Sequence, residues 1–276
     1  MSDEFDLPIH EHDGITRKLG LTLPDDSSPC VFASFEDQVE TLDGATLRRI
    51  AQSGDRDVRG VFGQSWITDQ GSHGSCNGFS EAEALRKAIK RMGVECPPLS
   101  GAYAYSLMNG GRDNGSNLNV AMDKVAESGI CLASTVGRDQ IYRSQYDTAK
   151  ADAEAAQRKG FEAYAVRTLA GWWTALALGW DCVFAIDVGR NFNSIDANGF
   201  PGLSNGSGNH AMSADGLIWP GGELAALGVN HWTTNWGLNG RCMIGERHLE
   251  QTIDNHVFYC VRSAVVAVNN VPTLGG

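Results

Sequence analysis

Residues 70–91, QGSHGSCNGFSEAEALRKAIKR, decide the fold of this 276-residue chain. Apolar residues recur at spacings of three and four from Phe79 to Met92, charged residues fill the other positions, and Gly93 stands where a helix would stop. This spacing predicts an amphipathic helix. Cys76 lies at its first turn, behind a glycine-rich turn, where the free N–H groups of a helix favour a thiolate. The stretch therefore predicts a cysteine nucleophile, with a buried structural cysteine as the alternative.

Two later segments carry motifs of their own. Residues 208–212 read GNHAM, and residues 230–240 read NHWTTNWGLNG. With residues 70–80, they resemble the nucleophile, histidine and asparagine motifs of papain-like cysteine peptidases, in the family's order along the chain. The resemblance is greatest to intracellular bacterial and phage members. It implies a papain-like two-lobe α+β fold and a peptidase that acts on polypeptides without a cofactor or metal.

The resemblance assigns catalytic roles to four residues. Cys76 would attack the carbonyl carbon, and His210 would hold the proton and pass it to the leaving amine. Asn230 would orient the imidazole through its other ring nitrogen. The Gln70 side chain and the Cys76 backbone N–H would bind the oxyanion, at roughly 3 kcal/mol per donor. Asn235 also precedes a Trp-Gly pair, but aligning both tryptophans of the motif places the orienting amide at Asn230.

Four positions match residues that line the family's substrate cleft. Gly115 and Ser116 would pair with the backbone of an extended substrate, as an added strand does. Ala211, with Ala185, would border the main specificity pocket and leave room for an apolar side chain. Trp232 would cover the histidine–asparagine contact from water, or would pack in the core without a further role.

The chain departs from the family beside the nucleophile. Extracellular members have a disulfide there, and its two positions are occupied by His73 and Asp113. We expect a charge-assisted hydrogen bond between these side chains, which a separation beyond about 4 Å would exclude. Asn77 follows the nucleophile where the family has tryptophan, and Gly78 replaces an alanine. These two changes alter the expected shape of the pocket more than its chemistry.

The composition limits which classes of partner and which cellular compartment we expect. The chain is 42% hydrophobic and 20% charged, as in ordinary globular proteins. Its net charge of −11 disfavours nucleic acids and anionic membranes as partners. The N-terminus lacks the features of a signal peptide, and no apolar run approaches the ~18 residues of a membrane span. Seven scattered cysteines without a CxxC pair indicate thiols in a reducing compartment, so we expect a cytoplasmic protein. The sequence is silent on the oligomeric state.

Periodicity outside the motifs predicts helices in the first part of the chain and strands in the second. This divides the chain into an N-terminal segment of unknown role (1–60), a mainly helical lobe (61–162) and a mainly β lobe (163–276). Helices are expected at 46–52, 118–127, 147–159 and 169–178, and strands at 182–186, 211–219, 224–232 and 257–268.

The N-terminal segment, residues 1–60, is polar and weakly periodic, which predicts mobility. His10, His12 and Asp13 lie close together, but without a fixed scaffold they would bind a metal only weakly. The segment lacks the long helical pattern of the family's inhibitory prosegment. We therefore expect activity without a cleavage step.

Three functions are compatible with these motifs. The first is a cysteine endopeptidase that cleaves extended polypeptides. The second is another acyl transferase with the same catalytic group, such as a deamidase, transglutaminase or isopeptidase. The third is a non-catalytic binding protein, which is disfavoured because no catalytic residue is missing.

Overall fold

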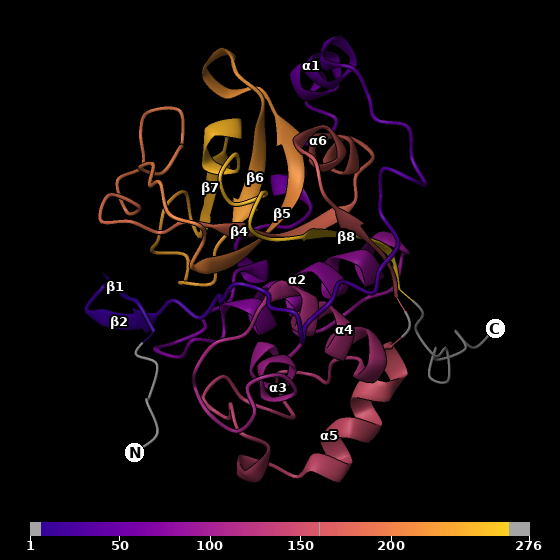
Figure 1. The fold of residues 1–276 in the computed structure, drawn as a ribbon, viewed down its shortest axis with the longest axis vertical. Helices are drawn as coiled ribbons and strands as arrows, with labels where there is room; N and C mark the ends of the chain where they lie inside the picture. The colour runs from indigo at the N-terminus through magenta and orange to yellow at the C-terminus, as the bar shows by residue number, and fades with distance from the viewer. Residues whose placement is uncertain (1–6, 160, 265–276) are drawn as a thin grey trace, which may run out of the picture.

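The computed structural model describes residues 7–159 and 161–264, which form two lobes joined along one long helix (Figure 1). The strands of the main sheet are β3 (Glu162–Val166), β4 (Asp181–Ile186), β5 (His210–Ile218), β6 (Ala225–Val229), β7 (Arg241–Ile244) and β8 (Phe258–Ser263). They are ordered β3-β8-β4-β5-β6-β7, and every neighbouring pair is antiparallel. The helices are α1 (Gly44–Ser53), α2 (Cys76–Arg91), α3 (Gly101–Ser106), α4 (Leu118–Ser128), α5 (Thr148–Ala155) and α6 (Leu169–Ala177). This arrangement confirms the predicted α+β fold with a helical lobe and a sheet lobe.

Helix α2 lies between the lobes and is buried from Cys76 to Ile89. The helix ends where Gly93 adopts a φ of +81°, a left-handed conformation that glycine adopts without strain. On the side of the helical lobe, Gly78 lets α3 approach closely, because a Cβ there would stand only 2.6 Å from the backbone nitrogen of Tyr105. The replacement of the family's alanine at Gly78 therefore has a packing reason.

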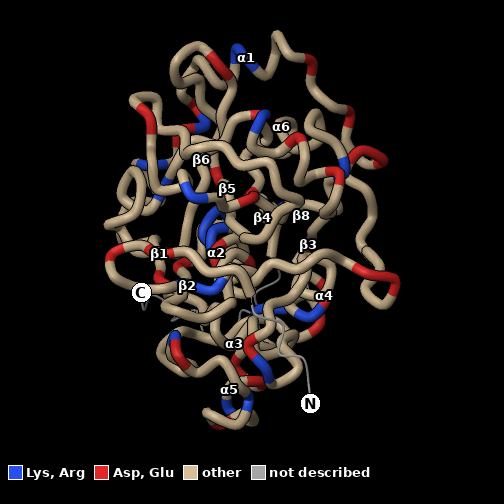
Figure 2. Tube along the Cα trace, turned by 60° about the vertical axis from the view of Figure 1, so that its left-hand side comes forward, with Lys and Arg blue, Asp and Glu red and all other residues tan. Residues whose placement is uncertain are grey.

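Most of the charged face of α2 is buried, unlike that of an amphipathic helix on a protein surface. Lys87 is fully buried, and its Nζ contacts Glu83 Oε1 at 2.9 Å and Asp215 Oδ2 at 2.5 Å. Arg241 completes the network with a 2.8 Å contact to Asp215. Figure 2 shows these charged parts of α2 in the middle of the molecule. Because the buried charges neutralise one another, the network joins α2 to the sheet without leaving an unpaired ion.

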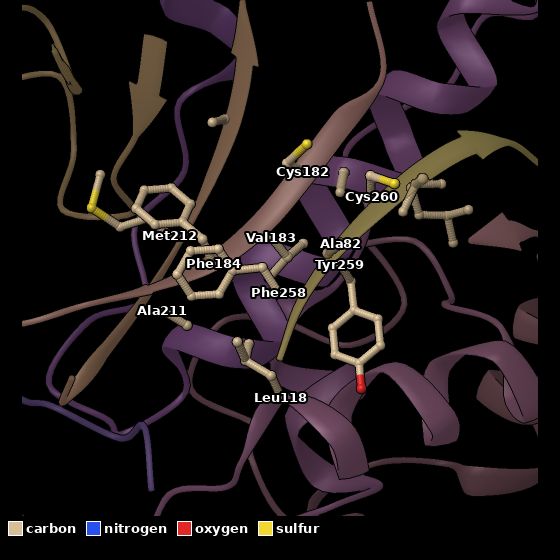
Figure 3. Packing of buried hydrophobic residues seen from close by; sticks show 14 of the residues in the cluster. Ala82, Leu118, Cys182, Val183, Phe184, Ala211, Met212, Phe258, Tyr259 and Cys260 are labelled. Carbon is tan, nitrogen blue, oxygen red and sulfur yellow. The ribbon is translucent and has the colours of Figure 1, made fainter. Parts of the chain in front are cut away.

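The hydrophobic core fills the space between α2 and the sheet (Figure 3). Phe184 on β4 and Phe258 on β8 meet edge to face, with ring centroids 6.1 Å apart. Trp172 on α6 packs edge-on against both rings. This aromatic cluster holds β4 and β8 beneath α6 and supports β5, which carries the functional residues.

Residues 9–18 form a β-hairpin, so the prediction of a mobile N-terminal segment is wrong for this part. Its strands are β1 (Ile9–His12) and β2 (Ile15–Lys18), paired antiparallel. Asp13 and Gly14 form the turn with φ of +53° and +70°. An Asp-Gly pair is a strong signal for such a turn, and it was available in the sequence. In Figure 1 the chain leaves this hairpin and passes in front of α2, between the lobes.

The structure confirms most of the predicted elements. The predicted helices correspond to α1, α4, α5 and α6, and the predicted strands to β4, β5, β6 and β8. The last part of the expected C-terminal strand, 265–268, lies outside the described residues. The elements that sequence patterns missed are short: α3, β1, β2, β3 and β7.

Candidate active site

Cys76 is the first residue of α2 and has no exposed surface. Burial raises the pKa of its thiol to about 11, although hydrogen bonds from the backbone of Ala211 and Gly20 act in the opposite direction. In this closed state the thiol is protonated at neutral pH.

His210 begins β5, and its Nε2 lies 2.9 Å from Oδ1 of Asn230. The backbone N–H of His231 donates to the same Oδ1, also at 2.9 Å. A backbone N–H can only donate, so this atom of Asn230 is the amide oxygen, and His210 must donate from Nε2. Its Nδ1 is then unprotonated, and it has no partner among the described residues. Burial lowers the pKa of His210 to about 4, so the ring is neutral and able to accept a proton at Nδ1.

Gln70 is also fully buried, and both ends of its amide are bonded. Its Oε1 accepts from Nε1 of Trp232 at 3.2 Å, and its Nε2 donates to the carbonyl of His73 at 2.9 Å. The indole ring of Trp232 stands over His210 with ring centroids 5.0 Å apart. The structure thus brings Gln70, Trp232 and His210 together, with the Gln70 donor engaged by its own loop.

A short backbone pairing joins the loop before the nucleophile to the loop after Asn230. Gln70 N donates to His231 O at 2.9 Å, and Thr233 N donates to Thr68 O at 3.2 Å. The Thr68 hydroxyl lies 2.9 Å from Nδ1 of the His231 ring, which is fully buried. Thr233 has a φ of +69°, which is unusual for a β-branched residue and persists only where the surroundings impose it. We call the Thr68–His231 contact the brace; no sequence motif indicated it.

Ser116 lies at the edge of the cleft and is held by a residue that departs from the family. The Asn77 amide donates to the Ser116 carbonyl at 2.8 Å and to its hydroxyl at 2.9 Å, from a fully buried position. The neighbouring Gly115 donates its N–H to the Tyr105 hydroxyl at 2.9 Å. Ala185 and Ala211 are direct partners on β4 and β5, and both are fully buried.

His73 and Asp113 are in contact, as predicted, with Nδ1 and Oδ2 3.5 Å apart. The same carboxylate receives the Gly74 N–H at 2.9 Å, the Tyr105 hydroxyl at 3.0 Å and the Lys18 ammonium at 3.1 Å. Burial alone would raise the pKa of Asp113, but these donors, with His73 foremost, lower it to about 2. Asp113 therefore stays ionised beside the nucleophile turn.

Residues 19–22 of the chain itself bond to Ser116 and Asn209, beside the residues that the sequence analysis assigned to substrate. Ser116 N donates to Gly20 O at 2.8 Å, and Thr22 N donates to Ser116 O at 3.0 Å. On the other side, Leu21 N donates to the carbonyl of Asn209, the residue before His210, at 3.1 Å. From the hairpin, His10 stacks on Trp232 with ring centroids 5.1 Å apart. Ser116 therefore pairs with the backbone of the N-terminal segment in this structure, and its role toward a substrate stays a prediction.

The overall fold is similar to solved structures of cysteine proteases. Xylellain, a cysteine protease from Xylella fastidiosa, matches with a TM-score of 0.66 and 16% identity, over 90% of this chain and 97% of that one. Bromelain from Ananas comosus, in complex with the inhibitor E64, matches with a TM-score of 0.58 and 17% identity, over 71% of this chain and 93% of that one. The chain has a papain-like fold. A recombinant stem bromelain precursor also matches, with a TM-score of 0.62 and 17% identity, over 84% of this chain and 77% of that one.

The similarity to these proteins lies in the fold, at 16–17% sequence identity. No protein-family model matches the sequence, and no curated protein is similar to it at the level of sequence. The described residues contain no group of three or more His, Cys, Asp or Glu side chains that could hold a metal ion. None of the helices in the described ranges is long and apolar enough to cross a membrane.

Proposed function

We propose that this protein is a cysteine peptidase that hydrolyses peptide bonds through a thioester on Cys76. The observation that carries the proposal is the hydrogen bonding around Asn230. It requires His210 to hold its proton on Nε2, which leaves Nδ1 free to take the thiol proton. A cysteine at a helix N-terminus with such a base is an activated nucleophile once water and substrate reach it.

The proposed reaction has two steps. In the first, the Cys76 proton moves to His210 Nδ1, the thiolate attacks the substrate carbonyl, and the imidazolium protonates the leaving amine. In the second, His210 takes a proton from water, and the hydroxide releases the acid from the thioester. The Cys76 N–H and the Gln70 amide would stabilise both oxyanions; one hydrogen of Gln70 Nε2 is bonded to the His73 carbonyl, and the second would donate to the oxyanion. Asn230 keeps the ring in place throughout.

The substrate class we propose is an extended polypeptide. The polar edges of the cleft, Ser116 and the Asn209 carbonyl, bond the backbone of Gly20, Leu21 and Thr22 and not their side chains. A cleft that pairs with backbone groups on both sides suits any extended peptide and selects weakly by sequence. Pairing through the backbone favours a peptidase over enzymes that recognise a single side-chain amide.

The test is digestion of a peptide library by the purified protein, with Cys76→Ala beside it and Cys96→Ala as a matched cysteine control. We expect new peptide termini with the wild type and with Cys96→Ala, and none with Cys76→Ala. Release of ammonia or transfer of glutamine side chains without backbone cleavage would replace the peptidase with a deamidase or transglutaminase. Equal cleavage by Cys76→Ala would refute the mechanism.

A further inference from the structure

Asn77 follows the candidate nucleophile on the first turn of α2 and has no exposed surface. The resemblance to papain-like peptidases predicts a tryptophan at this position and assigns no role to an amide. Burying a polar group costs free energy unless the group forms hydrogen bonds. The hydrogen bonds of Asn77 therefore indicate what its side chain does.

Both amide hydrogens of Asn77 are directed at one residue. Its Nδ2 donates to the carbonyl oxygen of Ser116 at 2.8 Å and to the Ser116 hydroxyl at 2.9 Å. A carbonyl oxygen can only accept, so the atom that faces it is the amide nitrogen. The amide oxygen, Oδ1, has no partner among the described residues. Because an unpaired buried oxygen costs stability, the side chain is better explained by its effect on Ser116 than by its own hydrogen bonding.

Ser116 pairs with an extended chain through both polar groups of its backbone. In this structure its N–H donates to Gly20 O at 2.8 Å, and its carbonyl accepts from Thr22 N at 3.0 Å. A carbonyl oxygen has two lone pairs. Asn77 takes one of them and leaves the second for the extended chain, so the amide fixes the direction in which the carbonyl points.

The loop that carries Ser116 has a second attachment, which ends one residue earlier. Gly115 N donates to the Tyr105 hydroxyl at 2.9 Å, and this hydroxyl donates to Asp113 at 3.0 Å. Ser116 itself is bonded by the N-terminal segment and, among the other described residues, by Asn77 alone. Asn77 is therefore the hydrogen-bonded link between Ser116 and the nucleophile helix.

We infer that Asn77 is a positioning residue that holds the backbone edge at Ser116 in place relative to the Cys76 thiol. Consecutive residues on a helix move together, so the two hydrogen bonds of Asn77 place Ser116 relative to the sulfur. The inference rests on the proposed function, because a substrate would have to use the same edge that Gly20 and Thr22 use in this structure.

The inference has a kinetic signature. A backbone hydrogen bond at Ser116 would be present both when the substrate binds and in the transition state. Loss of such an interaction raises KM and leaves kcat unchanged. A general loss of structure acts differently, because it lowers the amount of active enzyme and so the apparent kcat. The two constants together therefore distinguish positioning from support of the fold.

The experiment compares the wild type with Asn77→Leu, which keeps the branched shape of the side chain and removes both N–H donors. Asn119→Leu is the matched control, because Asn119 is also buried and donates to a backbone carbonyl, that of Ser28, at 2.8 Å, while its amide oxygen accepts from Tyr259. We expect KM for peptide hydrolysis to rise about tenfold in Asn77→Leu, with kcat within about twofold of the wild type. Asn119→Leu should keep both constants. Asn77→Ala removes the amide without adding apolar bulk and repeats the measurement.

A second measurement tests whether the lost binding depends on the Ser116 carbonyl. Each N–H of a cleaved peptide outside the scissile bond is replaced in turn by an ester oxygen, which removes one donor. In the wild type we expect kcat/KM to fall about tenfold at the position whose N–H meets the Ser116 carbonyl. The same replacement should cost Asn77→Leu less than about threefold, whereas a replacement that meets the Asn209 carbonyl should cost both proteins equally.

An unchanged KM and an unchanged ester effect in folded Asn77→Leu and Asn77→Ala would overturn the inference and leave the proposed function standing. A fall in kcat at constant KM would also overturn it, because that result indicates structural support only. If the wild type hydrolyses no peptide, the proposed function fails, and hydrogen exchange at the Ser116 amide decides the positioning role. Exchange about tenfold faster in Asn77→Leu than in the wild type would keep this role, and exchange at the wild-type rate would remove it.

Discussion

The brace between Thr68 and His231 offers the sharpest test of how the two loops around the site are held. Thr68→Val keeps the branched shape and removes only the hydroxyl. The Thr68 hydroxyl is the ring's hydrogen-bond partner at 2.9 Å, and Nε2 of His231 has none among the described residues. The variant therefore leaves a buried imidazole unsatisfied, at a cost of about 1–3 kcal/mol. Thr68→Ser restores the hydroxyl and is the matched control.

The expected loss in activity follows from the residue that the brace positions. The paired loop carries Gln70, whose complete loss as an oxyanion donor would cost about 10²–10³ in kcat. A misplaced Gln70 would still stabilise the oxyanion in part. We therefore expect kcat to fall about tenfold with little change in KM. Urea unfolding and steady-state peptide hydrolysis measure the two effects, and alkylation of Cys76 provides a step that needs no oxyanion donor.

A general loss of structure is distinguished from loss of positioning by comparing these readouts. Positioning requires that hydrolysis falls while alkylation stays at the wild-type rate, and that Thr68→Ser recovers most of the activity. If Thr68→Val unfolds at the wild-type urea concentration and hydrolyses peptides at the wild-type rate, the brace has no energetic role. Equal losses in hydrolysis and alkylation would mean that the variant disturbs Cys76 itself.

Three further predictions concern the site and its support. Gln70→Ala should lower kcat by about 10²–10³ in peptide hydrolysis, and Gln70→Glu should not recover it because a carboxylate donates no hydrogen bond; an unchanged kcat would remove Gln70 from the oxyanion site. Lys87→Met should destabilise the protein by about 3–5 kcal/mol in urea unfolding, because Glu83 would keep a buried charge without a cation and Asp215 would keep only Arg241; a neutral result would contradict the network. The pKa of Asp113 is lowered to about 2 in the folded chain, below the usual value of 3.8, so its stabilising contribution is complete above about pH 4 and is lost as the pH falls toward 2. The difference in urea unfolding between the wild type and Asp113→Asn should therefore be the same at pH 7 and pH 5, and a difference that shrinks over this range would contradict the lowered pKa of Asp113.

Sequence patterns predicted the long elements well because each carries its own periodicity. Residues 76–91 could be assigned as a helix from the spacing of apolar side chains, and β4 and β5 from runs of buried residues. Short elements such as α3 and β7 have too few residues for a period to emerge. Their conformation is decided by neighbours: Gly101 starts α3 against Gly78, and β7 forms by pairing with β6.

The charged residues of α2 show a different limit of sequence reasoning. Glu83 and Lys87 have the spacing of a solvent-exposed ion pair on a helix surface. Their burial depends on Asp215 and Arg241, which lie more than a hundred residues away and supply the compensating charges. Nothing local to α2 distinguishes a surface pair from part of an interior network.

The sequence by itself determined the chemistry that this protein can offer: a cysteine at a helix start, a histidine at a strand start and an amide to orient it, in one order along the chain. These assignments depend on residue type and local spacing, which a single sequence contains. Only the tertiary structure decided whether these residues are covered or accessible. Residues 7–22 lie over the thiol because a glycine, two cations and a β-turn at Asp13 and Gly14 meet partners from three distant loops. Contacts between segments so far apart leave no period or spacing to read, so the closed site becomes visible only when the chain is folded.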